Sequence, residues 1–265
     1  MFFGSVIYYL SIILLIGIAV LCWIFLRNRS FRLQKIIIIT IMVLNTAQHF
    51  LKSVLYPQYF GTGFTYISTA YNMCALLIIL SPVVYLFGNR FWKNFVFLVG
   101  TVAGLGAIAF PVWYLNKPLT ALGWDYLRFY ICHSLLFLSS LLPLLWGHYK
   151  IKRQEFWQIG LGFLLALCMI LLNNVVSIVI GLHPGVSAQN LYQSLLHDNP
   201  CMLMGPKEGF EWLLAVIKPL SLPAFCGNNP TGYYAPILWY AVPLYIGITG
   251  LAYVVFTLAD RKPKK

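Results

Sequence analysis

Two residues in a strongly apolar chain, Cys74 and His133, combine a latent nucleophile with a base. The thiolate is the reactive form of Cys, and burial in apolar surroundings raises the pKa of the thiol. A neighbouring imidazole that takes the proton activates the sulfur as a nucleophile. Both residues also have a structural interpretation, because Cys packs as a small hydrophobic side chain and His bonds one helix to another. Their positions in the sequence do not show that they meet.

Five further polar residues lie in apolar segments, at a depth similar to that of this pair. Asn45, Gln48 and His49 are spaced i, i+3 and i+4, so they share one helix face, which we expect to point into a helix bundle. Asn173 and Asn174 lie late in another apolar segment. We expect the five to line an outward-facing pocket between helices, where they would bond a headgroup or an oxyanion. Taken singly, each is more typical of helix–helix hydrogen bonding, which contributes about 1 kcal/mol per bond.

The elements that carry these residues are predicted to cross a membrane. Of the 265 residues, 60% are apolar and only 9% are charged, whereas about 25% of the residues in an ordinary soluble domain are charged. We therefore predict an all-α polytopic membrane protein, a seven-helix bundle forming a single transmembrane domain over residues 1–265. A span needs about 20 mostly apolar residues. The segments that fit are 4–26, 36–56, 66–88, 95–115, 127–148, 156–180 and 235–258.

Basic residues set the expected orientation of these spans. Thirteen lysines and arginines flank the span ends on one side of the membrane, and five flank those on the other. The positive-inside rule places the richer side in the cytoplasm, which predicts an outside N-terminus, a cytoplasmic C-terminus and a multi-pass protein of the cell membrane. The thirteen are Arg27, Arg29, Arg32, Lys35, Arg90, Lys93, Lys150, Lys152, Arg153, Arg261, Lys262, Lys264 and Lys265. The five are Lys52, Lys117, Arg128, Lys207 and Lys218.

One long extracytoplasmic connection is expected, over residues 181–234. Within it, apolar residues at near-helical spacing from Pro206 to Leu220 predict an interfacial helix on the outer leaflet. Cys201 and Cys226 are the only cysteines outside the predicted spans. A disulfide between them would persist in an oxidising compartment and would stabilise the loop by about 3 kcal/mol. The alternative is two unpaired thiols.

Several chemistries are poorly supported by the residues present. The predicted spans hold no Asp or Glu near their middle, which argues against a carboxylate proton relay. The last span has no Lys for a retinal Schiff base, and the five His form no paired metal-ligand motif, so we expect neither metal nor cofactor. The glycines from Gly100 to Gly106 lie inside a span and predict a helix-packing face. The apolar composition excludes a nucleic-acid binder.

Short motifs around the Cys–His pair resemble the YwaF-like integral membrane family, which includes the vertebrate transmembrane protein 164. They are Tyr71–Pro82, Asn89–Phe95, Phe110-Pro111, Arg128–Leu136 and Leu172–Asn174, covering roughly residues 66–180. The resemblance implies a membrane acyltransferase that moves fatty acyl chains between glycerophospholipids. Cys74 and His133 match the catalytic Cys and His of that family, with membrane lipids as the substrates.

Two other functions fit the same residues. The first is a non-catalytic carrier or sensor that binds a lipid or a small molecule in the outward-facing pocket. The second is a structural subunit of a membrane complex or a homo-oligomer, with the polar helix faces as its interface. Reactivity of Cys74 that depends on His133 distinguishes the enzyme from both.

Overall fold

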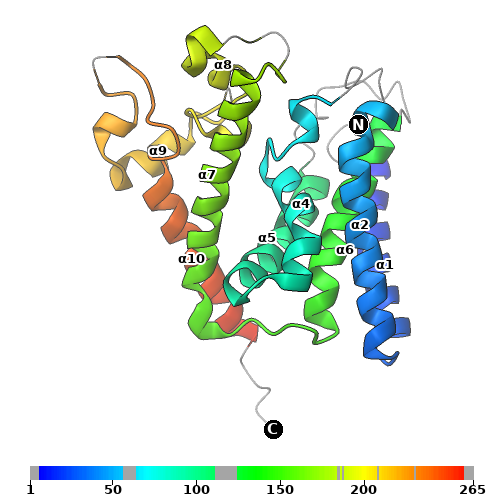
Figure 1. Ribbon diagram of the computed structural model, residues 1–265. Helices are drawn as coiled ribbons and strands as arrows, with labels where there is room; N and C mark the ends of the chain where they lie inside the picture. The colour runs from blue at the N-terminus through cyan, green and yellow to red at the C-terminus, as the bar shows by residue number, and fades with distance from the viewer. Residues whose placement is uncertain are drawn as a thin grey trace. The chain divides into compact units, whose positions relative to one another are not determined.

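The computed structural model of the chain describes residues 6–55, 64–110, 124–183, 186, 188–207, 209–229 and 231–259. Its regular elements are helices (Figure 1), and the only pairing of extended backbone in the described residues is one isolated bridge between Cys226 and Tyr234. The contacts divide the chain into two compact units. Unit 1 comprises Met1–Phe64 and Cys74–Ile151, and unit 2 comprises Thr65–Met73 and Lys152–Lys265.

Five helices in the described part of the chain are long and apolar enough to cross a membrane. They are α1 (Val6–Leu26), α2 (Phe31–Leu55), α5 (Arg90–Ala109), α6 (Trp124–Leu145) and α7 (Trp157–Val179). The other two predicted spans correspond to shorter apolar helices, α4 (Met73–Phe87) and α10 (Ala241–Ala259). The helix expected from residue 66 begins only at Met73, because Tyr66–Ser68 form a separate 3-10 turn followed by a bend.

The packing of unit 1 depends on a close approach of α5 to α6. A Cβ atom at Gly104 would lie 2.7 Å from the backbone nitrogen of Phe137, and one at Gly100 would collide with Ser140. These two glycines confirm the predicted packing face, whereas nothing lies within 4 Å of a Cβ atom at Gly106. Small residues at such positions let two helix backbones approach closely, which is how membrane helices gain van der Waals contact.

Helix α2 packs against α6 with one buried face. Asn45 and His49 lie on that face with Ile38 and Met42, and all four side chains are buried. Gln48 is half-buried and directs its amide nitrogen to the carbonyl oxygen of Arg128, at 3.4 Å. The prediction that this polar row points inward is confirmed, and α2 is thereby fixed in its rotation about its own axis.

In unit 2, α7 packs against α10, where a side chain at Gly160 would collide with Thr249 and Tyr245. The long connection contains α8 (Leu191–Asp198) and α9 (Leu213–Ile217). The interfacial helix predicted from Pro206 is therefore limited to a single short stretch, because Gly209 has a left-handed backbone (φ +82°) that interrupts helical geometry. Glu208 lies outside the described residues, as do Lys117 and the basic tail 261–265.

The disulfide expected in this connection is not formed in the structure, where Cys201 and Cys226 are both free thiols. Their surroundings differ: the backbone amide of Met73 bonds the Cys201 sulfur, whereas the Cys226 thiol donates to the carbonyl oxygen of Trp239 at 3.7 Å. Burial raises the pKa of both thiols, so each is held in its protonated form.

Candidate functional site

Cys74 occupies the first turn of α4, as the second residue of that helix. Its side chain is half-buried and is not disulfide-bonded. Because α4 begins only at Met73, the thiol lies in the first helical turn, and not about two turns below a helix start at residue 66, as the sequence had predicted. A half-buried sulfur at a helix end combines apolar packing with access for a reactant.

His133 lies on α6 and has its tautomer set by its own helix. The ring nitrogen Nδ1 is 2.8 Å from the carbonyl oxygen of Phe129, and the ring stacks at a tilt on the Phe129 ring with centroids 4.2 Å apart. A carbonyl oxygen only accepts hydrogen bonds, so Nδ1 carries the hydrogen and Nε2 of the neutral ring is the acceptor. The imidazole is therefore oriented with its basic nitrogen directed away from the helix backbone.

Hydrogen bonds from two adjacent residues of α2 show how deep Cys74 and His133 lie along their helices. Asn45 donates from Nδ2 to the carbonyl oxygen of Cys132 at 3.0 Å, and the Thr46 hydroxyl donates to that of Ile78 at 2.8 Å. These two carbonyls therefore lie at nearly one level of unit 1, on α6 and α4. Cys74 precedes Ile78 by one turn and His133 follows Cys132, so the pair differs in depth by about 7 Å along the helix axes.

The side-chain oxygen of Asn45 is a hydrogen-bond acceptor that is not used within the described residues. The Asn45 side chain is 2% exposed, and its oxygen Oδ1 has no hydrogen-bond partner among the described residues. A buried unsatisfied acceptor is costly, and such an atom is a candidate for bonding a ligand. Because the amide nitrogen already bonds Cys132, this residue would receive a hydroxyl or ammonium hydrogen from a substrate, not stabilise an oxyanion.

Asn173 and Asn174 belong to unit 2 and hold the segment that leads into α4. Asn173 donates to the Thr69 hydroxyl at 2.8 Å, and Asn174 donates to the carbonyl oxygens of Tyr71 (3.1 Å) and Ile170 (2.8 Å). Their amide nitrogens thus fix the chain at residues 69–71, three residues before Cys74. Their predicted role in binding substrate stays a prediction, as does the role of Gln48 and His49.

A cluster around Asp198 in unit 2 was missed by the sequence analysis. The Tyr66 hydroxyl donates to Oδ2 of Asp198 at 2.6 Å, and His183 Nε2 lies 2.7 Å from the same oxygen. The rings of Tyr66 and His183 stack with centroids 3.7 Å apart. Burial opposes ionisation of the carboxyl, but these hydrogen bonds outweigh it and lower the pKa of Asp198, while burial and the bond to Asp198 raise that of Tyr66. The signal available in the sequence was the rarity of acids, since the chain has only six.

The described residues contain no group of three or more His, Cys, Asp or Glu side chains arranged to hold a metal ion. The model of the TMEM164 family matches residues 2–226, a longer stretch than the motifs around the Cys–His pair. No curated protein and no solved structure matches the chain. The family match covers most of the sequence and agrees with the long apolar helices. The chain therefore belongs to the TMEM164 family and is a helical membrane protein.

Proposed function

We propose that this protein is a membrane acyltransferase that moves fatty acyl chains between lipids through a thioester on Cys74, with His133 as the base. The observation that carries the proposal is the orientation of His133: its Nδ1 is committed to the Phe129 carbonyl at 2.8 Å, which leaves Nε2 as the proton acceptor. Cys74 and His133 both belong to unit 1, on α4 and α6, and their difference in depth of about 7 Å means that the proton would pass through a bridging water.

The first half-reaction forms the acyl-enzyme. Nε2 of His133 takes the thiol proton, and the Cys74 sulfur attacks the carbonyl carbon of an acyl ester. The bond from that carbon to the glycerol oxygen breaks, and the imidazolium returns the proton to the leaving oxygen. The products are a lysolipid and a thioester on Cys74.

The second half-reaction transfers the acyl group. His133 removes the proton from the hydroxyl of an acceptor lysolipid, whose oxygen attacks the thioester carbon. The carbon–sulfur bond breaks, and the released Cys74 thiolate is reprotonated. Oδ1 of Asn45 is suited to bonding a polar hydrogen of the acceptor, because it is buried and has no partner among the described residues.

The proposed topology has seven crossings in the cell membrane, with α4 and α10 joining the five long apolar helices. The N-terminus lies outside and the C-terminus in the cytoplasm, as the positive-inside rule favours. Cys74 then lies at the outer end of α4, where a lipid ester sits near the interface while its acyl chains stay in hydrocarbon.

The test is capture of the thioester on the full-length protein in detergent micelles. A phospholipid with a radiolabelled acyl chain is added, and protein-bound label that hydroxylamine releases is measured. We expect labelling of the unmodified protein and of Cys22→Ser, a control cysteine in α1 that is also half-buried. We expect none in Cys74→Ser, and a drop of at least a hundredfold in the labelling rate of His133→Asn.

Label that persists in Cys74→Ser would overturn the assignment of the nucleophile. A protein that retains lipid but never forms the thioester would instead be a non-catalytic lipid binder. A protein that neither retains lipid nor reacts would favour a structural subunit. Thermal unfolding of each variant shows whether a loss of labelling reflects a loss of fold.

A further inference from the structure

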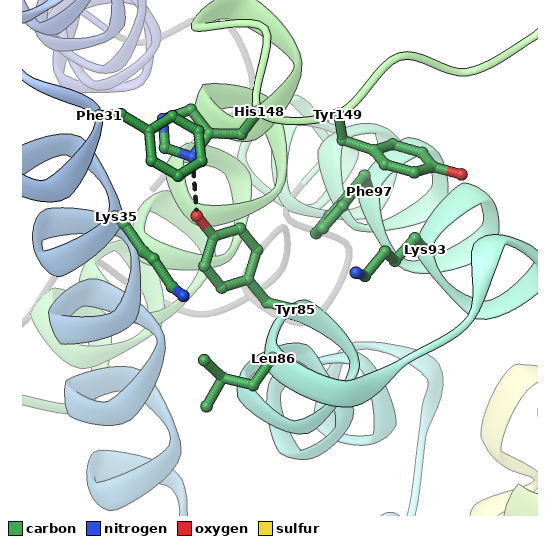
Figure 2. A pocket seen from close by; sticks show the side chains of 8 residues that line it. All are labelled: Phe31, Lys35, Tyr85, Leu86, Lys93, Phe97, His148 and Tyr149. Carbon is green, nitrogen blue, oxygen red and sulfur yellow. Dashed lines mark hydrogen bonds between the residues drawn. The ribbon is translucent and has the colours of Figure 1, made fainter.

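A polar pocket lies at the end of unit 1 opposite to Cys74 (Figure 2). Tyr85, one of its lining residues, follows Cys74 by 11 residues on α4, which is about 16 Å along the helix axis. The cavity has a volume of about 210 Å³. We call it the lysine pocket, and its lining residues are Phe31, Lys35, Tyr85, Leu86, Lys93, Phe97, His148 and Tyr149.

A chain of hydrogen bonds builds one wall of the lysine pocket. The Gln34 amide nitrogen donates to the carbonyl oxygens of Leu26 (2.8 Å) and Arg27 (3.0 Å), so its Oε1 is the atom that accepts from Nε2 of His148 at 2.9 Å. Nδ1 of His148 is 3.0 Å from the Tyr85 hydroxyl. The bonds at Gln34 therefore fix the imidazole with Nε2 as a donor, and Nδ1 and the tyrosine hydroxyl share one hydrogen.

The turn after α6 positions His148 and Tyr149 at the lysine pocket. Gly147 has a left-handed backbone (φ +74°), which ends the helix and turns the chain, as Gly commonly does after a helix C-terminus. His148 then stacks on Phe31 with centroids 4.0 Å apart, and the Tyr149 hydroxyl donates to Oδ1 of Asn94 at 2.6 Å. The walls are thus held by their own contacts before any ligand enters.

Two ammonium groups give the lysine pocket its charge. Figure 2 shows Lys35 and Lys93 entering from α2 and α5, with their nitrogens directed toward the space beside Tyr85. The sequence of unit 1 contains ten lysines and arginines and a single acid, Asp125. Asp125 lies near the start of α6, whereas the pocket adjoins its end, about 30 Å away. No carboxylate of unit 1 is therefore within reach to neutralise these ammonium groups.

We infer that the lysine pocket binds the phosphate group of an anionic phospholipid. Lys35 and Lys93 supply charge to the phosphate oxygens, and protonation of His148 at Nδ1 frees the Tyr85 hydroxyl to donate to them. Two exposed aromatic rings belong to the pocket or adjoin it in the sequence: Phe31, a lining residue, is 63% exposed, and Phe87, next to lining Leu86, is 82% exposed. A phosphate in the pocket would place attached acyl chains along these exposed rings, which a free phosphate ion has no means to use.

The site is separate from the proposed acyl-transfer chemistry and does not depend on it. The pocket lies among helix ends and turns that together carry seven of the ten basic residues of unit 1. They are Arg27, Arg29, Arg32, Lys35, Arg90, Lys93 and Lys150, of which Lys35 and Lys93 line the pocket. Basic pockets between membrane helices are a recognised way to hold anionic headgroups on the cytoplasmic side. This end is the cytoplasmic one in the proposed topology.

The test is retention of lipid by the full-length protein in neutral detergent micelles, measured by native mass spectrometry. Micelles remove the charged bilayer surface, so only a specific site distinguishes phosphatidylglycerol from zwitterionic phosphatidylcholine. We expect preferential retention of phosphatidylglycerol, and a loss of roughly tenfold or more in K35Q/K93Q, since each basic residue near a lipid headgroup contributes about a factor of five. The matched control R29Q/R32Q removes two exposed charges at the same end outside the pocket and should stay within about twofold of the unmodified protein.

The charge-preserving variant K35R/K93R shows that the effect concerns charge and not folding, because it should keep the preference for phosphatidylglycerol. Equal losses in K35Q/K93Q and R29Q/R32Q would overturn the pocket as the binding site. Retention that survives in a folded K35Q/K93Q would do the same. Inorganic phosphate is the second probe: if it displaces phosphatidylglycerol at comparable concentration, the pocket takes free phosphate and the lipid assignment is wrong.

Discussion

At the Cys74 end of unit 1 the polar face of α2, which carries a lysine (Lys52) beside its amides and imidazole, is largely buried against other helices, whereas the lysine pocket holds ammonium groups that reach solvent. Asn45 is 2% exposed, while Lys35 is exposed and Lys93 half-buried. Burial has a different cost for the two kinds of group: a neutral group needs only its hydrogen bonds, whereas a charged group needs a partner, as buried Lys52 has, or water, as at the lysine pocket. Neutral groups are therefore suited to orienting a reaction, and the lysines to holding a charged ligand.

Removing the base at the Cys74 end gives the largest expected effect. His133→Asn should lower the rate of acyl transfer by a factor of about 100 to 10,000, because a general base contributes that much. K35Q/K93Q should leave the same rate within about twofold, since the pocket is a separate site. A turnover assay on both variants checks this, and a large drop in K35Q/K93Q would show that the two ends are one functional unit.

Helix packing beneath His133 gives the next largest effect. Gly104→Ala places a methyl group 2.9 Å from the His133 carbonyl oxygen and 2.7 Å from the Phe137 nitrogen, which should destabilise the protein by about 1–3 kcal/mol. Gly106→Ala, on the same helix, meets nothing within 4 Å and should be neutral or stabilising by up to about 1 kcal/mol. Thermal unfolding in detergent compares the two. Similar unfolding temperatures would contradict the close approach of α5 and α6.

The amide of Asn45 gives a smaller effect. Asn45→Leu removes the hydrogen bond to the Cys132 carbonyl while keeping side-chain volume, at a cost of about 1 kcal/mol, and it also removes the unpartnered Oδ1. We expect acyl transfer to slow by about tenfold with lipid retention at the lysine pocket unchanged. Asn45→Asp, which keeps an acceptor but loses the donor, distinguishes the two roles: acyl transfer retained in that variant would assign the effect to the acceptor oxygen.

The smallest effect is the pH dependence of the lysine pocket. Burial and then the charge of Lys35 lower the pKa of His148 below its ordinary value. A bound anion offsets the repulsion from Lys35 on α2 and Lys93 on α5, so the pKa of His148 rises on binding. By linkage, lipid retention should tighten severalfold as pH falls from 7 toward 5. His148→Gln should abolish this dependence. A pH-independent affinity in the unmodified protein would remove His148 from the site, and Tyr85 on α4 does not titrate in this range.

Sequence periodicity predicted which faces are buried but not which residues meet. The i, i+3, i+4 spacing of Asn45, Gln48 and His49 correctly placed them inward, and the small residues Gly100 and Gly104 correctly marked a packing face. Both follow from local geometry, because helical spacing alone assigns a residue to a face.

The lysine pocket could not be found in this way. It joins Tyr85 to His148 across 63 residues and His148 to Gln34 across 114, and no local pattern encodes such pairings. The predicted start of the third span was wrong for a related reason. The residues before Met73 are apolar enough for a helix, but Asn173 and Asn174 bond the chain at residues 69–71 in a non-helical form.

The side chain of Gln34 also sets an order for biogenesis. Its two bonds to Leu26 and Arg27 lie within one helical hairpin, so they can form as soon as α1 and α2 have been inserted. Its third bond waits for His148, which is synthesised 114 residues later. The turn between α1 and α2 is therefore fixed at an early stage of translation, while the bond of Gln34 to His148 forms only after α6 has been synthesised. A ribosome stalled before residue 148 would carry a nascent chain in which the two bonds of Gln34 to the turn after α1 can form and its bond to His148 cannot.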